Sequence, residues 1–297
     1  MRLLPVQGDL PVQRGPVTAR LDGIAAITFD FGNTLVPVTR SALQRVVEVT
    51  AAGIAAGVPG LDPDRFLQVW AEERERQFRE EVPQFREVDL AERLVRVFAR
   101  LRGMSPPAAD GRWDQAAAAA LSDRSEVADG VEIYSRAFVD SLPASPSVGA
   151  MFARLAAGRN LAILSNWPLA ATIDRYAEAH GWTEHLRAIV VSQRVGTIKP
   201  HPVIFAAARE ALGSPPAKSI LHVGDDWAAD VAGALDAGWR AAWLSVRPDD
   251  SPLPTSERHP TRAPDLELTA LDQLEERLGP ALRETMTAAR TRETAAG

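Results

Sequence analysis

The sequence predicts an α/β fold: a Rossmann-like three-layer core with a parallel sheet and an inserted α-helical cap domain. Two observations lead to this prediction. Short apolar runs alternate with helical patterns, and the main runs end at a polar residue. A long block without any strand signal separates the first run from the others. Apolar runs without polar alternation are typical of strands buried on both faces of a parallel sheet.

Five apolar runs are expected to form the strands. They are IAAITF (24–29), LAIL (161–164), AIVV (188–191), ILHVG (220–224) and AAWLSV (241–246). The segment DVAGALDAGW before the last run is typical of a helix, with Gly238 where a left-handed terminator would fall. This alternation is that of a doubly wound fold, in which ligands bind beyond the carboxyl ends of the strands. The polar residues that follow the runs should therefore carry the chemistry.

Amphipathic helices replace the strands between residues 38 and 142. Asp62 followed by Pro63 is a favourable helix start, with an N-cap residue and a proline in the first turn. Residues 91–101 place their apolar side chains on one face at helical spacing. The charged run EERERQFREE (72–81) is expected to be a solvated helix face. The whole stretch is expected to be an inserted helical domain.

The predicted organisation divides the chain into four parts. We expect an N-terminal extension (1–22), a core made of residues 23–38 and 143–271, a helical cap (39–142) and a C-terminal helical tail (272–297). The stretch RPDDSPLPTSERHPTRAP, which follows the last strong strand, is rich in proline and aspartate and is expected to be a surface loop.

Composition narrows the classes of function. Lysine and arginine number 33 against 39 acidic residues, and the net charge of −6 has the wrong sign for a nucleic-acid surface. The chain has no cysteine, which excludes disulfides, thiolate metal sites and a cysteine nucleophile. The opening residues lack the apolar stretch of a signal peptide, and no segment reaches the roughly 18 apolar residues of a membrane span. We therefore expect a soluble, cytoplasmic protein without nucleic-acid or membrane partners.

The polar residues at or just after the predicted strand ends suit a single reaction. Asp30 offers a nucleophilic carboxylate, Ser165 a hydroxyl donor and Lys199 a fixed positive charge. Asp225 and Asp230 add carboxylates, and their spacing suits one loop that enters a helix, so both can face one hard cation such as Mg²⁺. Phosphoryl transfer needs this combination because its catalysis consists mostly of positioning and of neutralising charge on the phosphate oxygens.

Four segments resemble the ordered motifs of the haloacid dehalogenase superfamily. They are FDFGNTL (29–35), LSN (164–166), KPHPVIF (199–205) and GDDWAAD (224–230). The helical stretch before LSN is similar to the cap that this family inserts after its first motif. The resemblance implies a hydrolase that acts on a small phosphorylated substrate and uses Mg²⁺ as its cofactor.

The resemblance also implies roles for the matching residues. Asp30 would attack phosphorus and become an aspartyl phosphate, and Ser165 would donate a hydrogen bond to a phosphoryl oxygen. Lys199 would neutralise both Asp30 and the phosphate. Thr34, in the loop of the first motif, would steady the same pair.

The implied metal site draws on the first and fourth motifs. Asp30, the backbone carbonyl of Gly32 and Asp225 would ligate Mg²⁺, while Asp226 or Asp230 would hold it through water or orient the other ligands. The substrate site is expected to include Asn33, Asn166 and Trp167.

Gly32 departs from the pattern of the family's phosphatases. A second aspartate usually stands there and exchanges protons with the leaving group and with water, an effect of about 100- to 10,000-fold. Three explanations stay open: an acidic leaving group that departs unassisted, an acid from the cap such as Glu87 or Asp89, or a long-lived covalent intermediate. The sequence predicts that Gly32→Asp raises activity on simple phosphate esters.

Two other functions compete with a phosphatase. The haloacid dehalogenases proper also lack the second aspartate, but they need no metal and no acidic fourth motif. Here Asp225, Asp226 and Asp230 would repel one another and Asp30 unless a divalent cation were present, which favours phosphate over halide. The third alternative is a non-catalytic member of the family that binds a phosphorylated ligand, and Gly32 keeps it open.

Overall fold

The structure, a computed structural model, describes residues 21–104 and 123–279 and has a six-stranded parallel sheet at its centre. The strand order is β3-β2-β1-β4-β5-β6, so the chain runs outward from β1 in both directions, as in a doubly wound fold. The predicted fold class is confirmed. The strands are β1 (Ala26–Phe29), β2 (Asn160–Ser165), β3 (Ala188–Val191), β4 (Ile220–Gly224), β5 (Arg240–Leu244) and β6 (Leu266–Leu268).

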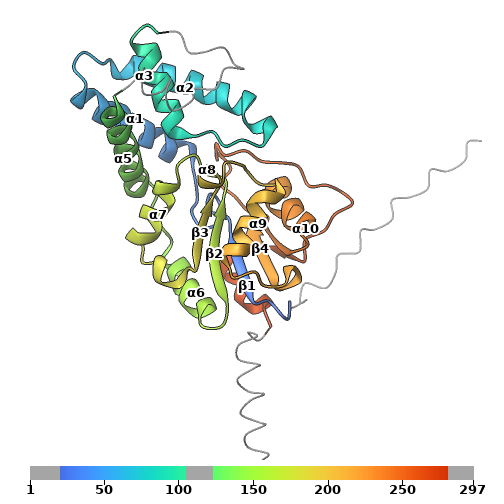
Figure 1. Cartoon of the computed structure of the whole chain (residues 1–297). Helices are drawn as coiled ribbons and strands as arrows, with labels where there is room; N and C mark the ends of the chain where they lie inside the picture. The colour runs from blue at the N-terminus through green and yellow to red at the C-terminus, as the bar shows by residue number, and fades with distance from the viewer. Residues whose placement is uncertain (1–20, 105–122, 280–297) are drawn as a thin grey trace, which may run out of the picture.

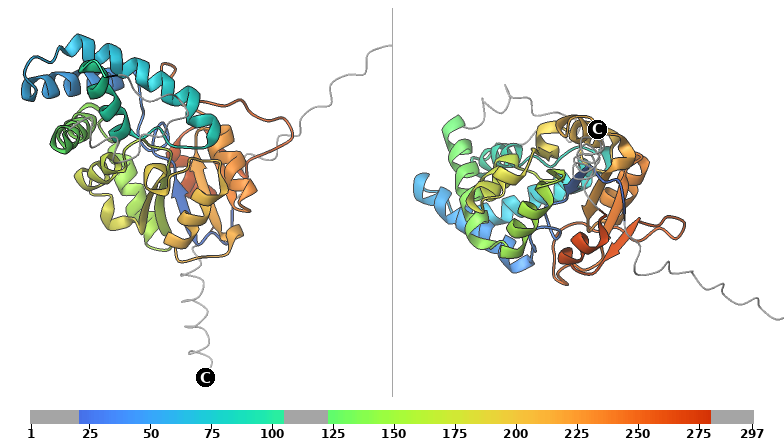
Figure 2. Two further views of the ribbon diagram at one scale, coloured as in Figure 1. Left: turned by 45° about the horizontal axis from the view of Figure 1, so that its top comes forward. Right: turned by 90° about the horizontal axis from the view of Figure 1, so that it is seen from below.

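Alternate residues of β1 enter two separate cores because successive side chains point to opposite faces of a sheet. Ile27 and Phe29 join a core shared with α6 and α7, whereas Ala26 joins a core shared with α9, η4 and α10. Helices therefore cover both faces (Figures 1 and 2). They are α6 (Pro146–Ala156), α7 (Ala170–Ala179), α8 (Ser192–Val195), α9 (Pro202–Ala211), the π-helical turn η4 (Trp227–Ala232) and α10 (Gly233–Asp236), with short 3-10 turns η2 (Thr183–His185) and η3 (Ala217–Ser219).

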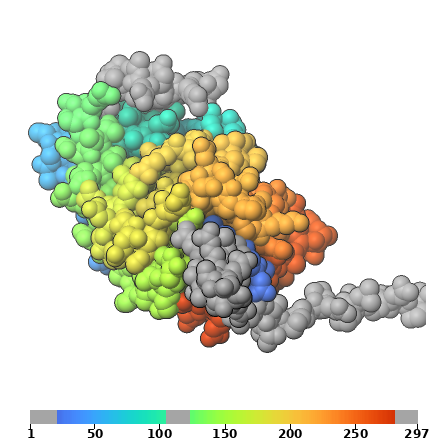
Figure 3. Space-filling view, turned by 60° about the horizontal axis from the view of Figure 1, so that its bottom comes forward, coloured from blue at the N-terminus to red at the C-terminus, as the bar shows by residue number. Residues whose placement is uncertain are grey.

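The segment from α1 to α5, between β1 and α6, is mostly helical in its described parts and lies toward the carboxyl ends of the strands (Figure 1). Figure 3 shows these segments, in blue, teal and green, packed against the yellow to red remainder of the chain. Asp62 caps its helix, as predicted, by accepting a hydrogen bond from the Asp64 backbone N–H. The division at residues 39 and 142 into core and cap domains stays a prediction. The elements are α1 (Arg40–Gly57), α2 (Pro63–Glu80), η1 (Val82–Gln84), α3 (Leu90–Leu101) and α5 (Arg124–Ser141).

The prediction of a solvated face for residues 72–81 is wrong for part of α2. Glu73 and Gln77 are buried because α3 packs against this side of the helix. Glu73 forms ion pairs with Arg76 and Arg100, and Gln77 accepts a hydrogen bond from Arg93 Nε at 2.7 Å. Burying polar groups is tolerated here because each has a partner. The charge pattern alone did not reveal the neighbouring helix.

The stretch 247–264 is a loop, as predicted, but part of it covers the carboxyl ends of the strands instead of lying only on the surface. Arg247 holds its turn by donating to the carbonyl oxygens of Leu253, at 2.9 Å, and Pro254, at 3.3 Å. The loop leads into β6, a three-residue strand that was not predicted because its apolar pattern is so short.

Much of the two predicted terminal segments lies outside the described residues. Within the described part, Leu21 forms a parallel bridge with Leu278, and Leu271–Arg277 is the 3-10 helix η5. None of the helices in the two described ranges has the length and apolar character needed to cross a membrane.

An aromatic cluster joins the helical insertion to the sheet. Phe31, directly after β1, lies 6.1 Å from Phe138 of α5, 5.6 Å from Trp167 and 5.2 Å from Tyr176, measured between ring centroids. All four side chains are buried. Aromatic rings at these separations add specific stabilisation to the burial of their apolar surface. The cluster therefore fixes the insertion above the residues that follow β1.

We expect Phe138→Ala to lower the free energy of unfolding by about 3–5 kcal/mol, because it leaves a cavity in this cluster. Urea unfolding followed by circular dichroism measures the change. Val203→Ala is the control, since Val203 is 50% exposed on α9 and its truncation should change stability by less than about 1 kcal/mol. Equal effects of the two substitutions would contradict the structural importance of the cluster.

Candidate active site

The buried ammonium of Lys199 joins three elements at the carboxyl end of the sheet. Lys199 Nζ donates to Asp30 Oδ1 at 2.8 Å, to the Leu164 carbonyl oxygen at 2.8 Å and to Asp230 Oδ1 at 2.6 Å. All three N–H groups thus have acceptors, which a buried ammonium requires. Burial would lower the pKa of Lys199, but the charges of Asp230 and Asp30 outweigh it and hold the pKa above its usual value. Lys199 is therefore a permanent cation.

Asn166 fixes the backbone of Lys199. Its side-chain Oδ1 accepts from the Lys199 N–H at 2.7 Å, and its Nδ2 donates to the Lys199 carbonyl at 3.0 Å. These two hydrogen bonds connect Asn166, which follows Ser165, to the backbone of Lys199. Asn166 was expected to bind substrate, but the structure uses both of its polar atoms for positioning.

Asp30 receives two donors on one oxygen. Besides the ammonium, Ser165 Oγ donates to Asp30 Oδ1 at 3.0 Å. Within the described ranges, no side chain donates to Asp30 Oδ2. Burial raises the pKa of Asp30 to about 6; Lys199 opposes this shift and the charge of Asp230 adds to it. Asp30 is therefore a carboxylate at neutral pH with one oxygen free of protein donors.

Asp230 is held on both of its oxygens. His222 Nε2 lies 3.1 Å from Oδ1, and the Asp226 backbone N–H donates to Oδ2 at 2.9 Å. The other ring nitrogen of His222 contacts Thr28 Oγ1 at 2.8 Å, so the ring is fixed as well. A Cβ at Gly224 would come 2.2 Å from the Asp230 carboxyl carbon, so only glycine leaves room for this approach. Asp230 orients Lys199.

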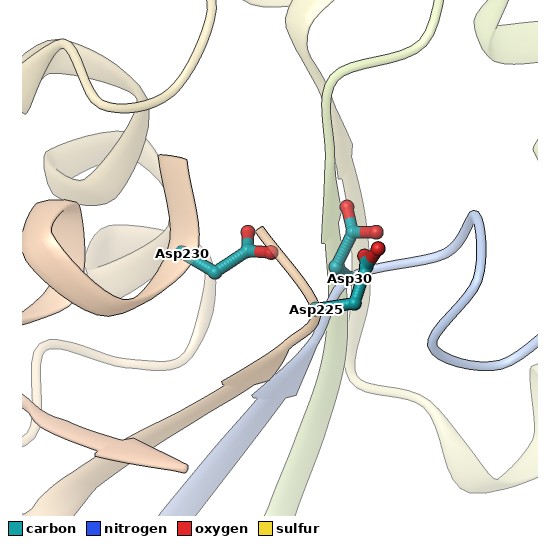
Figure 4. Close-up of side chains that lie close together, drawn as sticks. All are labelled: Asp30, Asp225 and Asp230. Atoms are coloured by element: carbon teal, nitrogen blue, oxygen red, sulfur yellow. The ribbon is translucent and has the colours of Figure 1, made fainter. Parts of the chain in front are cut away.

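Asp225 follows β4 and lies beside Asp30 (Figure 4). It accepts long hydrogen bonds from Thr34 Oγ1 and Asn33 Nδ2, both at 3.4 Å, and Arg247 Nη1 lies 3.2 Å from Oδ2. Burial and the neighbouring aspartates raise the pKa of Asp225 to about 8, which Arg247 only partly opposes. This carboxylate is therefore short of positive charge.

A cavity of about 340 Å³ opens above these residues. The sheet side contributes Asp30, Asn166, Lys199 and Asp225, and the helical insertion contributes mostly apolar side chains. The size suits a small molecule, and the mixture of apolar walls with a few convergent polar groups is typical of a ligand site.

Comparison with known proteins identifies the family. A family profile described as a haloacid dehalogenase-like hydrolase matches residues 24–238. The chain belongs to this family. The matched range includes all four segments that resembled the motifs, so the relationship inferred from them is confirmed.

Curated relatives of this haloacid dehalogenase-like hydrolase match only in part. Pyrimidine 5'-nucleotidase YjjG of Escherichia coli is 33% identical over 75 residues, which cover 25% of this chain and 33% of the relative. Phosphoserine phosphatase of Thermus thermophilus is 33% identical over 119 residues, which cover 39% of this chain and 43% of the relative. The matched segments thus span less than half of each relative.

Solved structures match over a larger share of the chain. A 2-haloacid dehalogenase from Pseudomonas syringae pv. tomato superposes with a TM-score of 0.60 at 22% identity and covers 85% of this chain and 97% of its own. A HAD phosphatase from Thermococcus onnurineus has a TM-score of 0.53 at 19% identity, with the same coverage. At such identities the likeness establishes the shared fold alone.

Three carboxylates in this haloacid dehalogenase-like hydrolase offer ligand atoms within 4.8 Å of one another, namely those of Asp30, Asp225 and Asp230. Asp226, which was expected to help hold the metal, is outside this group. Its Oδ1 instead caps η4 by accepting from the Ala229 N–H at 2.7 Å, and it also accepts from Ser256 Oγ. A capping residue at a helix start leads its side chain back to the backbone.

The donor set fits Mg²⁺ through Asp30 and Asp225. Both are oxygen ligands with raised pKa values, because burial and mutual repulsion leave them short of positive charge. A hard dication would relieve that repulsion. Asp230 fits less well, since its oxygens accept short hydrogen bonds, from Lys199 at 2.6 Å and from the Asp226 N–H at 2.9 Å, whereas the side-chain contacts of Asp225 are 3.2–3.4 Å long.

Other predicted residues also occupy definite places. Thr34 contacts Asp225 and not Asp30, which it was expected to steady. Asn33 adopts the left-handed conformation, φ 60°, which asparagine tolerates, and its amide bonds to Ser251 and to the Val38 N–H. Trp167 lines the cavity, although it also packs in the aromatic cluster.

Sequence reasoning missed Arg247 and Leu253. Arg247 stands just beyond the carboxyl end of β5, so the rule used for Asp30 and Asp225 could have identified it. Leu253 gave no signal. A Cβ at Gly32 would come 2.6 Å from Leu253 Cδ1 and 3.3 Å from the Trp167 ring, so the missing acid has been replaced by apolar contact.

The two cap carboxylates considered as substitute acids differ. Asp89 caps α3 by accepting from the Ala91 and Glu92 N–H groups, and it also accepts from Gln193. Glu87 lines the cavity, where burial raises its pKa, and it accepts a hydrogen bond from the Ser192 hydroxyl. Of these two residues, only Glu87 both lines the cavity and has a raised pKa.

We expect Asp225→Asn to stabilise the metal-free protein by about 1–3 kcal/mol at pH near 8.5, and by much less near pH 5. An aspartate whose folded pKa is raised binds its proton more tightly in the folded state, so stability is lost as pH rises from about 4 to about 8. Thermal unfolding in EDTA across this range measures the effect. Asp249→Asn, at an exposed position of the loop 247–264, is the control, and a pH-independent difference for Asp225→Asn would contradict this account.

Proposed function

We propose that this haloacid dehalogenase-like hydrolase is a Mg²⁺-dependent phosphatase that acts on a small phosphorylated metabolite. The observation that supports this most is that Asp30, Lys199 and Asp225 line one cavity, with Ser165 and Lys199 both donating to Asp30 Oδ1. The curated relatives named above support the same class, since they are a nucleotidase and a phosphoserine phosphatase.

In the proposed reaction the Asp30 carboxylate attacks phosphorus. The bond between Asp30 oxygen and phosphorus forms while the bond to the leaving oxygen breaks, and water later hydrolyses the aspartyl phosphate. Lys199 and Ser165, which meet at one Asp30 oxygen, supply charge and a hydrogen bond to the transferred group. The position of Lys199 is fixed in advance by Asp230 and Asn166, so little reorganisation of the ammonium is needed.

Mg²⁺, when bound by Asp30 and Asp225, would neutralise charge on the phosphoryl oxygens. The charge balance of the site supports this role. With all three carboxylates ionised, they face two nearby cations, Lys199 and Arg247, which leaves one negative charge before substrate arrives. A phosphate dianion would add two more, and a dication would restore neutrality to within one charge.

The proton that the leaving group needs must come from somewhere other than residue 32. We propose that Glu87 supplies it, because its carboxyl lines the cavity and is protonated more readily than an ordinary glutamate. An acidic leaving group, such as that of an acyl phosphate, would make this step unnecessary.

A metal-independent 2-haloacid dehalogenase is the second candidate. The apolar contact of Leu253 and Trp167 over Gly32 favours it, since displacement of halide from carbon needs no acid there. Halide release that is unaffected by EDTA would identify this activity.

A non-catalytic protein that binds a phosphorylated ligand is the third candidate. Beryllium fluoride with Mg²⁺ tests it, because a competent Asp30 should form a stable mimic of the aspartyl phosphate.

We expect Mg²⁺-dependent hydrolysis of at least one compound in a panel of sugar phosphates, acyl phosphates and other phosphorylated metabolites, and loss of activity by at least about 100-fold in Asp30→Asn. Asp225→Asn and Asp226→Asn form a matched pair. The first should weaken Mg²⁺ dependence, whereas the second retains its capping role and should keep most activity. Activity in the Asp30→Asn protein would exclude the carboxylate nucleophile.

The position of Leu253 changes what we expect of Gly32→Asp. Alone, this substitution requires Leu253 Cδ1 to move aside, so it should raise turnover less than it does when Leu253 is also truncated. Combined with Leu253→Ala, it should raise turnover on alkyl phosphates about 10- to 100-fold above Leu253→Ala alone. Steady-state phosphate release is compared among the unsubstituted protein, Gly32→Asp, Leu253→Ala and the double variant. A double variant that folds and binds Mg²⁺ but is no faster than Leu253→Ala would refute the role assigned to the missing acid.

A further inference from the structure

We propose that the end of the cavity formed by the helical insertion binds a second anionic group of the substrate, through Arg74, Arg93 and Tyr134. The inference rests on the proposed function, which assigns the phosphoryl group to the Asp30 end. All three residues line the same cavity as Asp30. They come from α2, α3 and α5, so the three helices converge on this end.

Arg93 is a buried cation without an acidic partner. Its side chain is 4% exposed, Nε donates to Gln77 Oε1 at 2.7 Å, and Cζ lies 4.9 Å from the centre of the Trp70 ring. Within residues 21–104 and 123–279, neither Nη group donates a hydrogen bond and no carboxylate forms an ion pair with the guanidinium. Burying a charged group without hydrogen-bond or ion-pair partners costs free energy, and a bound anion would supply those partners to Arg93.

Arg74 and Tyr134 share this character. Arg74 is half-buried, lies 4.8 Å from the centre of the Phe78 ring, and makes one long hydrogen bond, of 3.4 Å, to the Pro252 carbonyl. In the described part of the chain it has no ion pair, and the hydroxyl of Tyr134 has no hydrogen bond. Tyr134 is 4% exposed and stacks on Trp70.

Other arginines of α2 and α3 contrast with this pair. Arg76 pairs with Glu73 and Glu80, and Arg100 pairs with Glu72 and Glu73. Arg76 and Arg100 thus form ion pairs away from the cavity, whereas within the described residues neither Arg74 nor Arg93, which line it, forms one.

The nearest acids do not neutralise the pair. Glu87 shares its oxygens between the Ser192 hydroxyl and the Val88 N–H, and Asp89 caps α3. Burial lowers the pKa of Arg93 to about 10, and the charge of Arg74 adds to the shift, so the pair is cationic at neutral pH and short of negative charge.

The cavity walls indicate what lies between the two ends of the substrate. They are apolar, and include Leu43, Phe78, Val82, Phe85, Val88 and Ile198. Guanidinium groups bind planar oxyanions with paired hydrogen bonds, which suits a carboxylate or a second phosphate. The substrate class is thus a phosphate monoester that carries a second anion at the far end of a short, weakly polar spacer.

Binding of matched synthetic probes to the Asp30→Asn protein with Mg²⁺ tests the proposal without turnover. The probes are alkyl phosphates, ω-carboxyalkyl phosphates and α,ω-alkyl bisphosphates with spacers of one to four carbons, measured by calorimetry. We expect at least one doubly anionic probe to bind about tenfold or more tighter than the alkyl phosphate of equal length. The carboxylate and bisphosphate arms distinguish the two kinds of anion.

The arginines are tested in the same background. Arg74→Gln and Arg93→Gln should each abolish most of this preference while leaving alkyl phosphate binding within about twofold, and Arg93→Lys should retain part of it. Arg79→Gln, on the exposed side of α2, is the matched control and should retain the full preference. If Arg93→Gln does not fold, Arg74→Gln decides alone. Equal binding of singly and doubly anionic probes, or a preference that survives in the folded Gln variants, would overturn the proposal.

Failure of the proposed function is distinguishable. Simple carboxylates of three to five carbons test the arginine end alone. One outcome is that these carboxylates bind, that Arg74→Gln abolishes their binding, and that no phosphate binds. This outcome would overturn the phosphatase and sustain the second-anion site. If phosphate esters are turned over and a second anion changes neither binding nor turnover, the phosphatase is sustained and the second-anion site is overturned.

Discussion

The ammonium of Lys199 is the interaction on which the arrangement of the site depends. A buried cation must have acceptors for all of its N–H groups, and here they come from Asp30 after β1, Leu164 in β2 and Asp230 in η4. Satisfying the ammonium therefore brings three separate elements to one point. The same requirement explains the space at Gly224 and the fixed ring of His222, since both serve the position of Asp230.

The loop after β5 completes the site from the other side. Arg247 connects Asp225 to the backbone of this loop, and Leu253 occupies the space above Gly32. Glycine at residue 32 is thus coupled to an apolar contact from a distant segment. In the proposed phosphatase reaction, the packing of this loop would bear on how the leaving group is protonated, because Leu253 occupies the place that an acidic side chain at residue 32 would need.

Electrostatic balance connects the two ends of the cavity. The sheet contributes an excess of carboxylates, which suits a metal cation, while the insertion contributes two arginines that form no ion pair in the described residues, which suits an anion. Much of the remaining lining is apolar and keeps the local dielectric low, so each imbalance is stronger than it would be in water. A substrate that carried charge at both ends would match this pattern.

The sequence by itself determined the fold class and the chemical centre. Unbroken apolar runs predicted five of the six strands, and the polar residues that end three of them are Asp30, Ser165 and Asp225, because parallel strands present their carboxyl ends at one edge. Lys199 lies beyond β3 and α8, and the resemblance of KPHPVIF to a family motif indicated it. Tertiary structure alone decided which neighbouring polar residues face that centre. Asn166 and Asp226 bond to backbone or loop groups, and Asn33 divides its bonds between Asp225 and the loop. Leu253 and Arg93 reach the cavity from segments whose local pattern carries no such signal. Periodicity records which side of an element is buried, whereas the partner across a contact depends on packing between segments far apart in the chain.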